Sequence, residues 1–477
     1  MTTTEQQWHI FVENRAEVIA ALERGEIDGI LPAARGFLDG FAQFLMEHQI
    51  LATLSEFSDL RTRQSIPMMF FCSGLLYKPL FQLPSLQQIG SVLFRSPYIL
   101  RQLGFNAQQM ETGFYHTAHR PAQKPFDPEA IGECFAALQS EHYFEQQTQM
   151  LKLLAQRFPA QLRDGLWVMD SIHVHLPRGQ HTPAADFKAC VLGVYQGTVV
   201  WPLLWQFVDP DVAELTVGKT VIAAALQALP HGTLRHLLVD RGYLDGAWLS
   251  TLYRTHQVQV TMGLRDNMQA YTDLIGLTRL PDTQWDAVPP PDNHRDPAPQ
   301  RHLSYIETVD SWDSCNVPLV GCVIRDTYPT EVSYQVLVMT PPPNATRPLT
   351  AAEIYRGRGQ RWTLEEVFMT LTRYWQFDAL YACRQGVGMA QTHFALLAFT
   401  LLGFYQQEQD DFDPETSLNH APPPLPMPER ELAVYWGPYF TLLRPSEIVT
   451  LILTHTEAWL QRRTDILQTL RQFEGSP

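Results

Sequence analysis

The sequence predicts an α/β protein in which a mixed sheet carries helices on its faces and helical regions flank the sheet at both ends of the chain. Short aliphatic runs alternate with helical patterns between Leu166 and Leu264. Such alternation is typical of strands that are connected through helices. Before Leu166, apolar residues recur at three- and four-residue steps, which is typical of helices.

The composition indicates a folded protein without a leader or a membrane span. Hydrophobic residues make up 45% of the 477 residues and charged residues 18%, the balance of a soluble domain. The N-terminus, MTTTEQQWHI, has neither a basic nor an apolar segment, so we expect no signal peptide. The longest apolar stretch, residues 394–404, is too short to cross a bilayer and predicts a buried helix.

The cysteines and the net charge exclude some classes of protein. No CxxC pair is present, which argues against a disulfide framework and a thiolate zinc site, and we expect a cytoplasmic protein. The net charge of -15 weighs against indiscriminate nucleic-acid binding but leaves room for a local basic groove. The cysteines are Cys72, Cys134, Cys190, Cys315, Cys322 and Cys383.

The central region predicts the order β-β-β-α-β-α-β. The second and third strands form a hairpin that turns at Gln196-Gly197. The predicted strands are residues 166–170, 187–195, 198–207, 234–240 and 258–264, and the predicted helices are residues 212–229 and 246–256.

Around this region we expect further segments. A proline-rich loop and three antiparallel strands predict a β insertion, and the helical pattern resumes at Thr350. Residues 83–105 predict either a DNA-binding helix-turn-helix or an ordinary helical hairpin. The expected organisation is a helical, possibly DNA-binding region 1–160, core 161–265, β insertion 266–348, core 349–410, acidic and proline-rich linker 411–430 and helical tail 431–477.

Two aspartates end predicted strands. Asp170 follows Leu-Trp-Val-Met and Asp240 follows Leu-Leu-Val, so each carboxylate is expected where the edge of a sheet meets solvent. If the two strands are neighbours, the carboxylates converge into a set of oxygen ligands that suits Mg²⁺ or Mn²⁺. Each aspartate taken alone is more often a turn or cap residue, and that interpretation stays open.

A third acidic residue comes with a cluster of arginines. Thr363 and Glu366 have the spacing of a capping box, which predicts a helix start at Thr363 with Glu365 in the first turn. Carboxylate for metal and guanidinium for phosphate together suit phosphodiester chemistry. The alternative is a salt-bridged helix face. The arginines are Arg356, Arg358, Arg361 and Arg373.

These pieces together resemble a bacterial insertion-sequence transposase of the DDE class. The similar segments are VMDS, FKACVLGVYQGTVVWPLLWQF, LLVDRGY and RGQRWTLEEVF, spread over residues 166–404. The resemblance implies a ribonuclease-H-like catalytic domain with a β insertion. In the family's third motif, Arg361 and Glu365 fit, whereas Arg358 stands at the position of a tyrosine and Thr372 at that of a lysine.

The resemblance implies a function as well as a fold. Asp170, Asp240 and Glu365 would hold two Mg²⁺ or Mn²⁺ ions for cutting and joining DNA at the ends of an insertion sequence. The four arginines would contact DNA phosphates. Double-stranded DNA, both element ends and target, would be the partner, with a homodimer in the DNA complex and no membrane.

Two other functions remain open. His173 and His175 form an HxH pair on a predicted strand, which would suit a metal-dependent hydrolase. His231, His236 and His256 have no recognised ligand spacing toward that pair. The other alternative is a catalytically inactive or domesticated relative that binds DNA.

Overall fold

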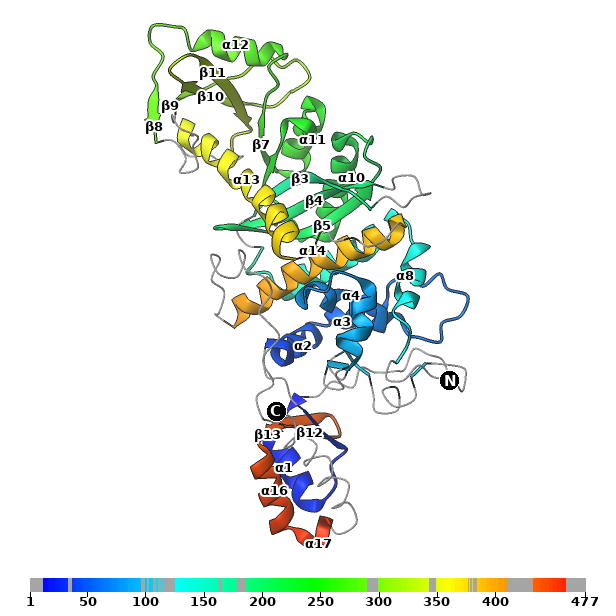
Figure 1. Ribbon diagram of the computed structural model, residues 1–477. Helices are drawn as coiled ribbons and strands as arrows, with labels where there is room; N and C mark the ends of the chain where they lie inside the picture. The colour runs from blue at the N-terminus through cyan, green and yellow to red at the C-terminus, as the bar shows by residue number, and fades with distance from the viewer. Residues whose placement is uncertain are drawn as a thin grey trace. The chain divides into compact units, whose positions relative to one another are not determined.

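Figure 1 shows a computed structural model of the chain, which divides into two compact units. The sheet unit consists of residues 139–373 and 413–419, and the terminal unit of residues 1–138, 374–412 and 420–477. The structure describes residues 12–32, 37–95, 99–100, 103–105, 109, 113–114, 125–162, 165–177, 186–289, 299–342, 349–375, 377, 380, 384–409 and 432–459.

The sheet unit is built on one nine-stranded mixed sheet, in the order β5-β4-β3-β6-β7-β11-β10-β9-β8. Its strands are β3 Leu166–Val174, β4 Phe187–Gln196, β5 Val199–Val208, β6 His236–Val239, β7 Gln259–Gly263, β8 Asp286–Val288, β9 Gln300–Ile306, β10 Val320–Thr327 and β11 Val332–Met339. Its helices are α9 Ser140–Arg157, α10 Glu214–Ala228, α11 Gly246–His256, α12 Gln269–Leu277 and α13 Ala351–Tyr374, with a 3-10 turn, η3, at Arg241–Tyr243.

The mixed α/β fold and the order predicted for the core are confirmed. Strands β3, β4 and β5 are antiparallel neighbours, and β6 and β7 then add in parallel to β3. The β4–β5 turn uses Gly197 with φ 63°, a left-handed conformation that glycine adopts without strain. Helix α11 begins where Asp245 accepts a hydrogen bond from the Trp248 N–H (2.9 Å) and has the predicted bounds.

The β insertion is a continuation of the core sheet. Strand β11 pairs antiparallel with β7, from Leu337 opposite Gly263 to Met339 opposite Thr261. The insertion contains four strands rather than the three predicted, because β8 adds to the edge at β9. If the insertion were a separate subdomain, β7 and β11 would both be edge strands with unpaired N–H and C=O groups. The pairing of β7 with β11 satisfies these groups.

Helices cover both faces of the core sheet. Strand side chains alternate between faces, so neighbours along β3 point to opposite sides. Met169 lies against Gly218 of α10 on one face. Asp170, the next residue, meets Arg361 of α13 on the other face. The sheet therefore separates a packed apolar side under α10 from a charged side under α13.

Helix α13 begins at Ala351, twelve residues before Thr363, so the helix start predicted at Thr363 is wrong. The capping box is formed at Thr350, whose hydroxyl accepts a hydrogen bond from the Glu353 N–H (3.3 Å). In return, the Glu353 carboxylate accepts one from the Thr350 N–H (2.9 Å). These reciprocal hydrogen bonds satisfy backbone donors at the true start of the helix.

The two stretches of helical pattern, from Thr350 and from Thr363, belong to this one continuous helix. Thr363 lies inside the helix and is buried, as is Leu364, the residue that precedes Glu365. No proline interrupts the helix, so the hydrogen-bond ladder runs through. Glu365 therefore stands in the body of a long helix rather than in a first turn.

A buried ion pair ties the insertion to the first half of α13. Arg301 of β9 donates two hydrogen bonds to Asp326 of β10 (2.6 and 2.7 Å) and a third to the Tyr355 hydroxyl of α13 (2.5 Å). Arg301 and Asp326 are 5% and 3% exposed, so the pair is satisfied by mutual contact rather than by water. The position of α13 over the sheet is thereby fixed from the insertion side.

The terminal unit contains a helical part with a long buried helix, α14 (Gln385–Glu408). Among the described residues, α14 is the one helix long and apolar enough to cross a membrane, but its apolar window is completely buried, as in a core helix. The buried helix predicted at residues 394–404 is confirmed within it. The helices of this part are α2 Phe37–Glu47, α3 Ile50–Ser55, α4 Met68–Leu80, α5 Leu86–Ser91, α8 Glu129–Ala136 and α14 Gln385–Glu408, with a 3-10 turn, η2, at Leu93–Arg95.

Residues near both ends of the chain contribute strands that the sequence analysis did not predict. A four-stranded sheet has the order β1-β13-β12-β2 and packs with three helices around a core that includes Leu22, Val434 and Trp459. The elements are β1 Val12–Glu13, α1 Arg15–Arg24, β2 Gly29–Pro32, β12 Leu432–Trp436, β13 Tyr439–Leu443, α16 Pro445–Thr454 and α17 Thr456–Trp459. The helix-turn-helix considered for residues 83–105 lies partly outside the described residues, and the linker at 411–430 lies outside them.

We predict that Gly218→Ala destabilises the sheet unit by about 1–3 kcal/mol, because its Cβ would lie 2.6 Å from the ring of Tyr243 and overpack the core. Gly276→Ala on α12 is the matched control, since nothing lies within 4 Å of its Cβ. Helix propensity should make that variant slightly more stable. Chemical denaturation of both variants checks this, and an equal effect of the two substitutions would contradict the packing of α10.

Candidate active site

The two aspartates lie on neighbouring parallel strands, Asp240 directly after the end of β6 and Asp170 in the middle of β3. The strand end predicted at Asp170 is therefore wrong, because pairing with β4 continues the strand to Val174. Strands β3 and β6 pair in parallel, with Met169 opposite Val239. Asp170 and Asp240 directly follow this pair, so both carboxylates lie where β6 ends beside β3. Asp240 has an extended backbone conformation and stands directly before η3. The neighbouring strands that the sequence analysis required are therefore present.

Arg361 connects Asp170 to Glu365. Its Nη1 donates to Asp170 Oδ2 (2.6 Å) and its Nη2 donates to Glu365 Oε1 (2.7 Å). The side chains of Arg361, Asp170 and Glu365 are 17%, 14% and 31% exposed, so the three charges meet in a partly dry environment. One guanidinium thus brings together two carboxylates that are distant in the chain.

The pKa of Asp170 is set first by burial and then by the charges around it. Burial raises the pKa of Asp170 to about 6, and the carboxylates of Glu365 and Asp240 also raise it. Arg361 and the Ser171 N–H, which donates to Asp170 Oδ1 (2.8 Å), act in the opposite direction. A second positive charge at this place would relieve the remaining repulsion.

A glycine lets α13 come close to the strands. A Cβ on Gly357 would lie 3.3 Å from side-chain carbons of Leu238 on β6 and of Thr261 on β7. Such contacts are tight, so a larger residue would push the helix away from the sheet. Gly357 precedes Arg361 by about one turn of the helix. The close approach therefore occurs next to the residue that holds the two carboxylates.

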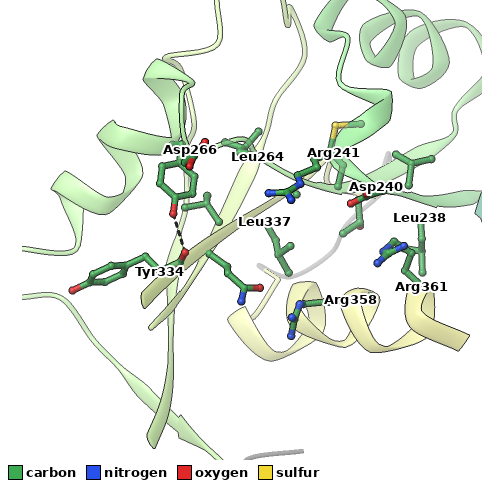
Figure 2. A pocket seen from close by; sticks show the side chains of 17 residues that line it. Leu238, Asp240, Arg241, Leu264, Asp266, Tyr334, Leu337, Arg358 and Arg361 are labelled. Carbon is green, nitrogen blue, oxygen red and sulfur yellow. Dashed lines mark hydrogen bonds between the residues drawn. The ribbon is translucent and has the colours of Figure 1, made fainter. Parts of the chain in front are cut away.

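A pocket of about 500 Å³ opens beside Asp240. Arg358 and Arg361 of α13 line this pocket, and Figure 2 shows Arg361 extending from the helix toward Asp240. Arg241 and Asp266 also line the pocket, from the strand side. Three arginines and two aspartates therefore line the pocket. Such a lining suits the binding of phosphate groups next to a cation.

The structure separates the four arginines that the sequence singled out. Arg361 and Arg358 line the pocket. Arg356 and Arg373 are exposed on α13 and are not among the lining residues. Sequence reasoning missed Arg241, although it directly follows the second strand-end aspartate and the same argument could have included it.

The donor set fits a hard divalent cation by its chemistry. Asp170, Asp240 and Glu365 offer only carboxylate oxygens, which Mg²⁺ and Mn²⁺ prefer. In the described part of the chain, no group of three or more Asp, Glu, His or Cys is close enough to hold a metal ion. Arg361 stands between Asp170 and Glu365, so metal binding by both requires its guanidinium to move.

The histidine pair has different surroundings. His173 and His175 are exposed on and just after β3, and His175 Nδ1 lies 3.0 Å from Asp186 Oδ2. Within the residue ranges given above, they belong to no group of three possible metal ligands. His236 instead contacts the Thr261 hydroxyl (2.8 Å) within the sheet. His175 thus contacts Asp186 rather than the carboxylates that meet on Arg361.

A mixed sheet with helices on both faces and aspartates on adjoining parallel strands is consistent with the ribonuclease-H-like fold of nucleic-acid enzymes. Residues 169–401 match the family model of the transposase DDE domain. The resemblance found in the sequence is thereby confirmed. The family consists of transposases, which act on DNA and typically use divalent metal ions. No curated protein matches the chain.

We predict that Asp170→Asn stabilises the metal-free protein by about 1–3 kcal/mol at pH 7. The pKa of Asp170 is about 6 in the folded chain, above its value of about 3.9 when unfolded, so folding retains a proton between these values. The unmodified protein therefore loses the stabilising contribution of this group as pH rises from about 4 to 6, whereas the free energy of unfolding of the variant should not fall in this pH range. Thermal unfolding of both proteins in the presence of a chelator, over a pH series, measures the difference.

The control for this variant is Asp209→Asn, which changes an exposed carboxylate of the same unit. Its stability should stay within about 0.5 kcal/mol of the unmodified protein at every pH. If Asp170→Asn is instead destabilised at pH 7, the ion pair with Arg361 outweighs the cost of burying the carboxylate, and the direction given for its pKa is wrong.

Proposed function

We propose that this chain is a DNA transposase that cuts and joins DNA at the ends of an insertion sequence, with Asp170, Asp240 and Glu365 as metal ligands. The observation that carries the proposal is the meeting of Asp170 and Glu365 on one arginine beside Asp240, within a transposase DDE domain. Two bound Mg²⁺ or Mn²⁺ ions would supply Lewis acidity for attack on phosphorus and for departure of the leaving oxygen.

The residues of the chain then have separate tasks. Asp170 and Asp240 approach from the sheet, and Glu365 approaches from α13, so the three carboxylates can surround a scissile phosphate from two elements. Arg361 and Arg358 would exchange contacts with carboxylates and solvent for contacts with DNA phosphates. Rigid elements on both sides favour a defined angle between the attacking and leaving oxygens.

The arginines of the pocket could bind DNA locally although the net charge of the whole chain is negative. The chain carries a net charge of -15, but three of the residues that line the pocket are arginines, Arg241, Arg358 and Arg361. A short positive surface beside the carboxylates can hold the phosphates nearest the reaction. Double-stranded DNA as the partner, a homodimer in the DNA complex and a cytoplasmic location belong to the same proposal.

Alanine substitution of Asp170, Asp240 or Glu365 should reduce strand cleavage by at least about 10³-fold, because several kcal/mol of transition-state stabilisation would be lost with the metal. The substrate is plasmid DNA that carries the sequences flanking the coding region, incubated with Mg²⁺ or Mn²⁺. Glu366→Ala, next to Glu365 but exposed, is the matched control.

Unchanged cleavage by Asp170→Ala and Asp240→Ala would overturn the assignment of these residues. A different result would identify the alternative function. If the unmodified protein binds the flanking DNA but does not cut it with either metal ion, the chain is a catalytically inactive or domesticated relative.

Arg361→Ala should weaken DNA binding and lower the slope of log K against log salt by about 1, as expected when one phosphate contact is lost. Fluorescence anisotropy of a labelled duplex over a salt series measures this slope. Arg157→Ala, on exposed α9 surface, is the control and should leave the slope unchanged. An unaltered slope for Arg361→Ala would show that Arg361 serves the carboxylates alone.

A further inference from the structure

A completely buried tyrosine lies behind the two aspartates. Tyr243 ends η3, three residues after Asp240, and its N–H donates to the Asp240 carbonyl (3.1 Å). Its hydroxyl lies 2.9 Å from the Ser171 hydroxyl and 3.4 Å from the Cys190 thiol. Ser171 directly follows Asp170. The tyrosine therefore reaches from the turn after one aspartate to the residue after the other.

These contacts form a continuous path between the aspartates. The Ser171 N–H donates to Asp170 Oδ1 (2.8 Å), and Ser171 and Cys190 are direct cross-strand partners on β3 and β4. The Tyr243 hydroxyl thus binds a pair of strands at the point where the Asp170 carboxylate is oriented. Backbone pairing fixes the strands, and this path connects η3 to the backbone that orients the carboxylate.

The fold makes room for the tyrosine ring. Gly218 of α10 faces the ring so closely that a Cβ there would lie 2.6 Å from it and 3.0 Å from Met169 Cε. The ring therefore fits into a recess that the missing side chain of this glycine leaves on α10. A ring confined in this way holds its hydroxyl in a fixed place.

The two partners of the hydroxyl and the hydroxyl itself are neutral. Burial raises the pKa of Tyr243 well above its usual range and the pKa of the Cys190 thiol to about 12. A neutral hydroxyl can donate one hydrogen bond and accept another, which suits a serine and a cysteine as partners. The network therefore orients the site without adding a charge to it.

We propose that Tyr243 is a positioning residue whose hydroxyl, through Ser171, sets the orientation of the Asp170 carboxylate relative to Asp240 for metal binding. The proposal rests on the proposed function, since it concerns the same metal ligands. Groups that orient metal ligands through hydrogen bonds typically change metal affinity by about 10- to 100-fold when they are removed. A tyrosine that merely fills the core would act through its ring and not through its hydroxyl.

Tyr243→Phe separates the two roles because it keeps the ring in its recess and removes only the hydroxyl. Binding of Mn²⁺ alone to the full chain is measured from the electron paramagnetic resonance signal of free Mn²⁺. The dissociation constant should rise by about 10-fold or more. Tyr143→Phe is the matched control, because Tyr143 is also completely buried in the sheet unit and belongs to α9.

Ser171→Ala removes the other partner of the hydrogen bond between Ser171 and Tyr243. It tests the positioning role independently if Tyr243→Phe does not fold. It should weaken Mn²⁺ binding to a similar degree, and the double variant should lose no more than the larger single effect, because both remove one interaction. A dissociation constant for Tyr243→Phe within about twofold of the unmodified protein overturns the positioning role, provided that Asp170→Ala loses Mn²⁺ binding. Undiminished binding by Asp170→Ala would instead remove the proposed metal site.

Discussion

The contact of Arg361 with both Asp170 and Glu365 is the interaction on which the site depends. Without it, Asp170 and Glu365 would lose the positive charge that they share, and like charges that approach in a partly buried environment repel strongly. The arginine makes the assembled arrangement stable in the absence of other cations. It also sets a competition, because the same carboxylate oxygens are the ones that a metal ion would use.

The sheet provides the framework for this contact. Because β11 continues the core sheet beyond β7, the insertion and the core share one rigid backbone, and the Arg301–Asp326–Tyr355 contact attaches α13 to that backbone. The helix that carries Glu365 is therefore attached at three places. Tyr355 contacts the insertion, Gly357 packs closely on the sheet, and Arg361 pairs with Asp170. Errors in the insertion would be transmitted to the site through the helix.

The core was predictable from sequence because its strands and helices are each marked by local patterns, such as the aliphatic run before the second aspartate and the cap of α11. The start of α13 was not, since two capping boxes, at Thr350 and Thr363, compete in sequence and only packing decides between them. The role of Tyr243 was also hidden, because its partners Ser171 and Cys190 are distant in the chain. Strands β1 and β2 were hidden because they are short and their partners, β13 and β12, are about 400 residues away in the chain.

The small sheet built from residues 12–32 and 432–459 has a consequence for biosynthesis. Strand β1 pairs with β13, so its partner is made long after it. At a translation rate of about 5–20 residues per second, this delay is roughly 20–85 s. During that time the apolar side chains of the early segment lack their partners on the ribosome, and a chaperone that shields this segment would favour correct folding over aggregation.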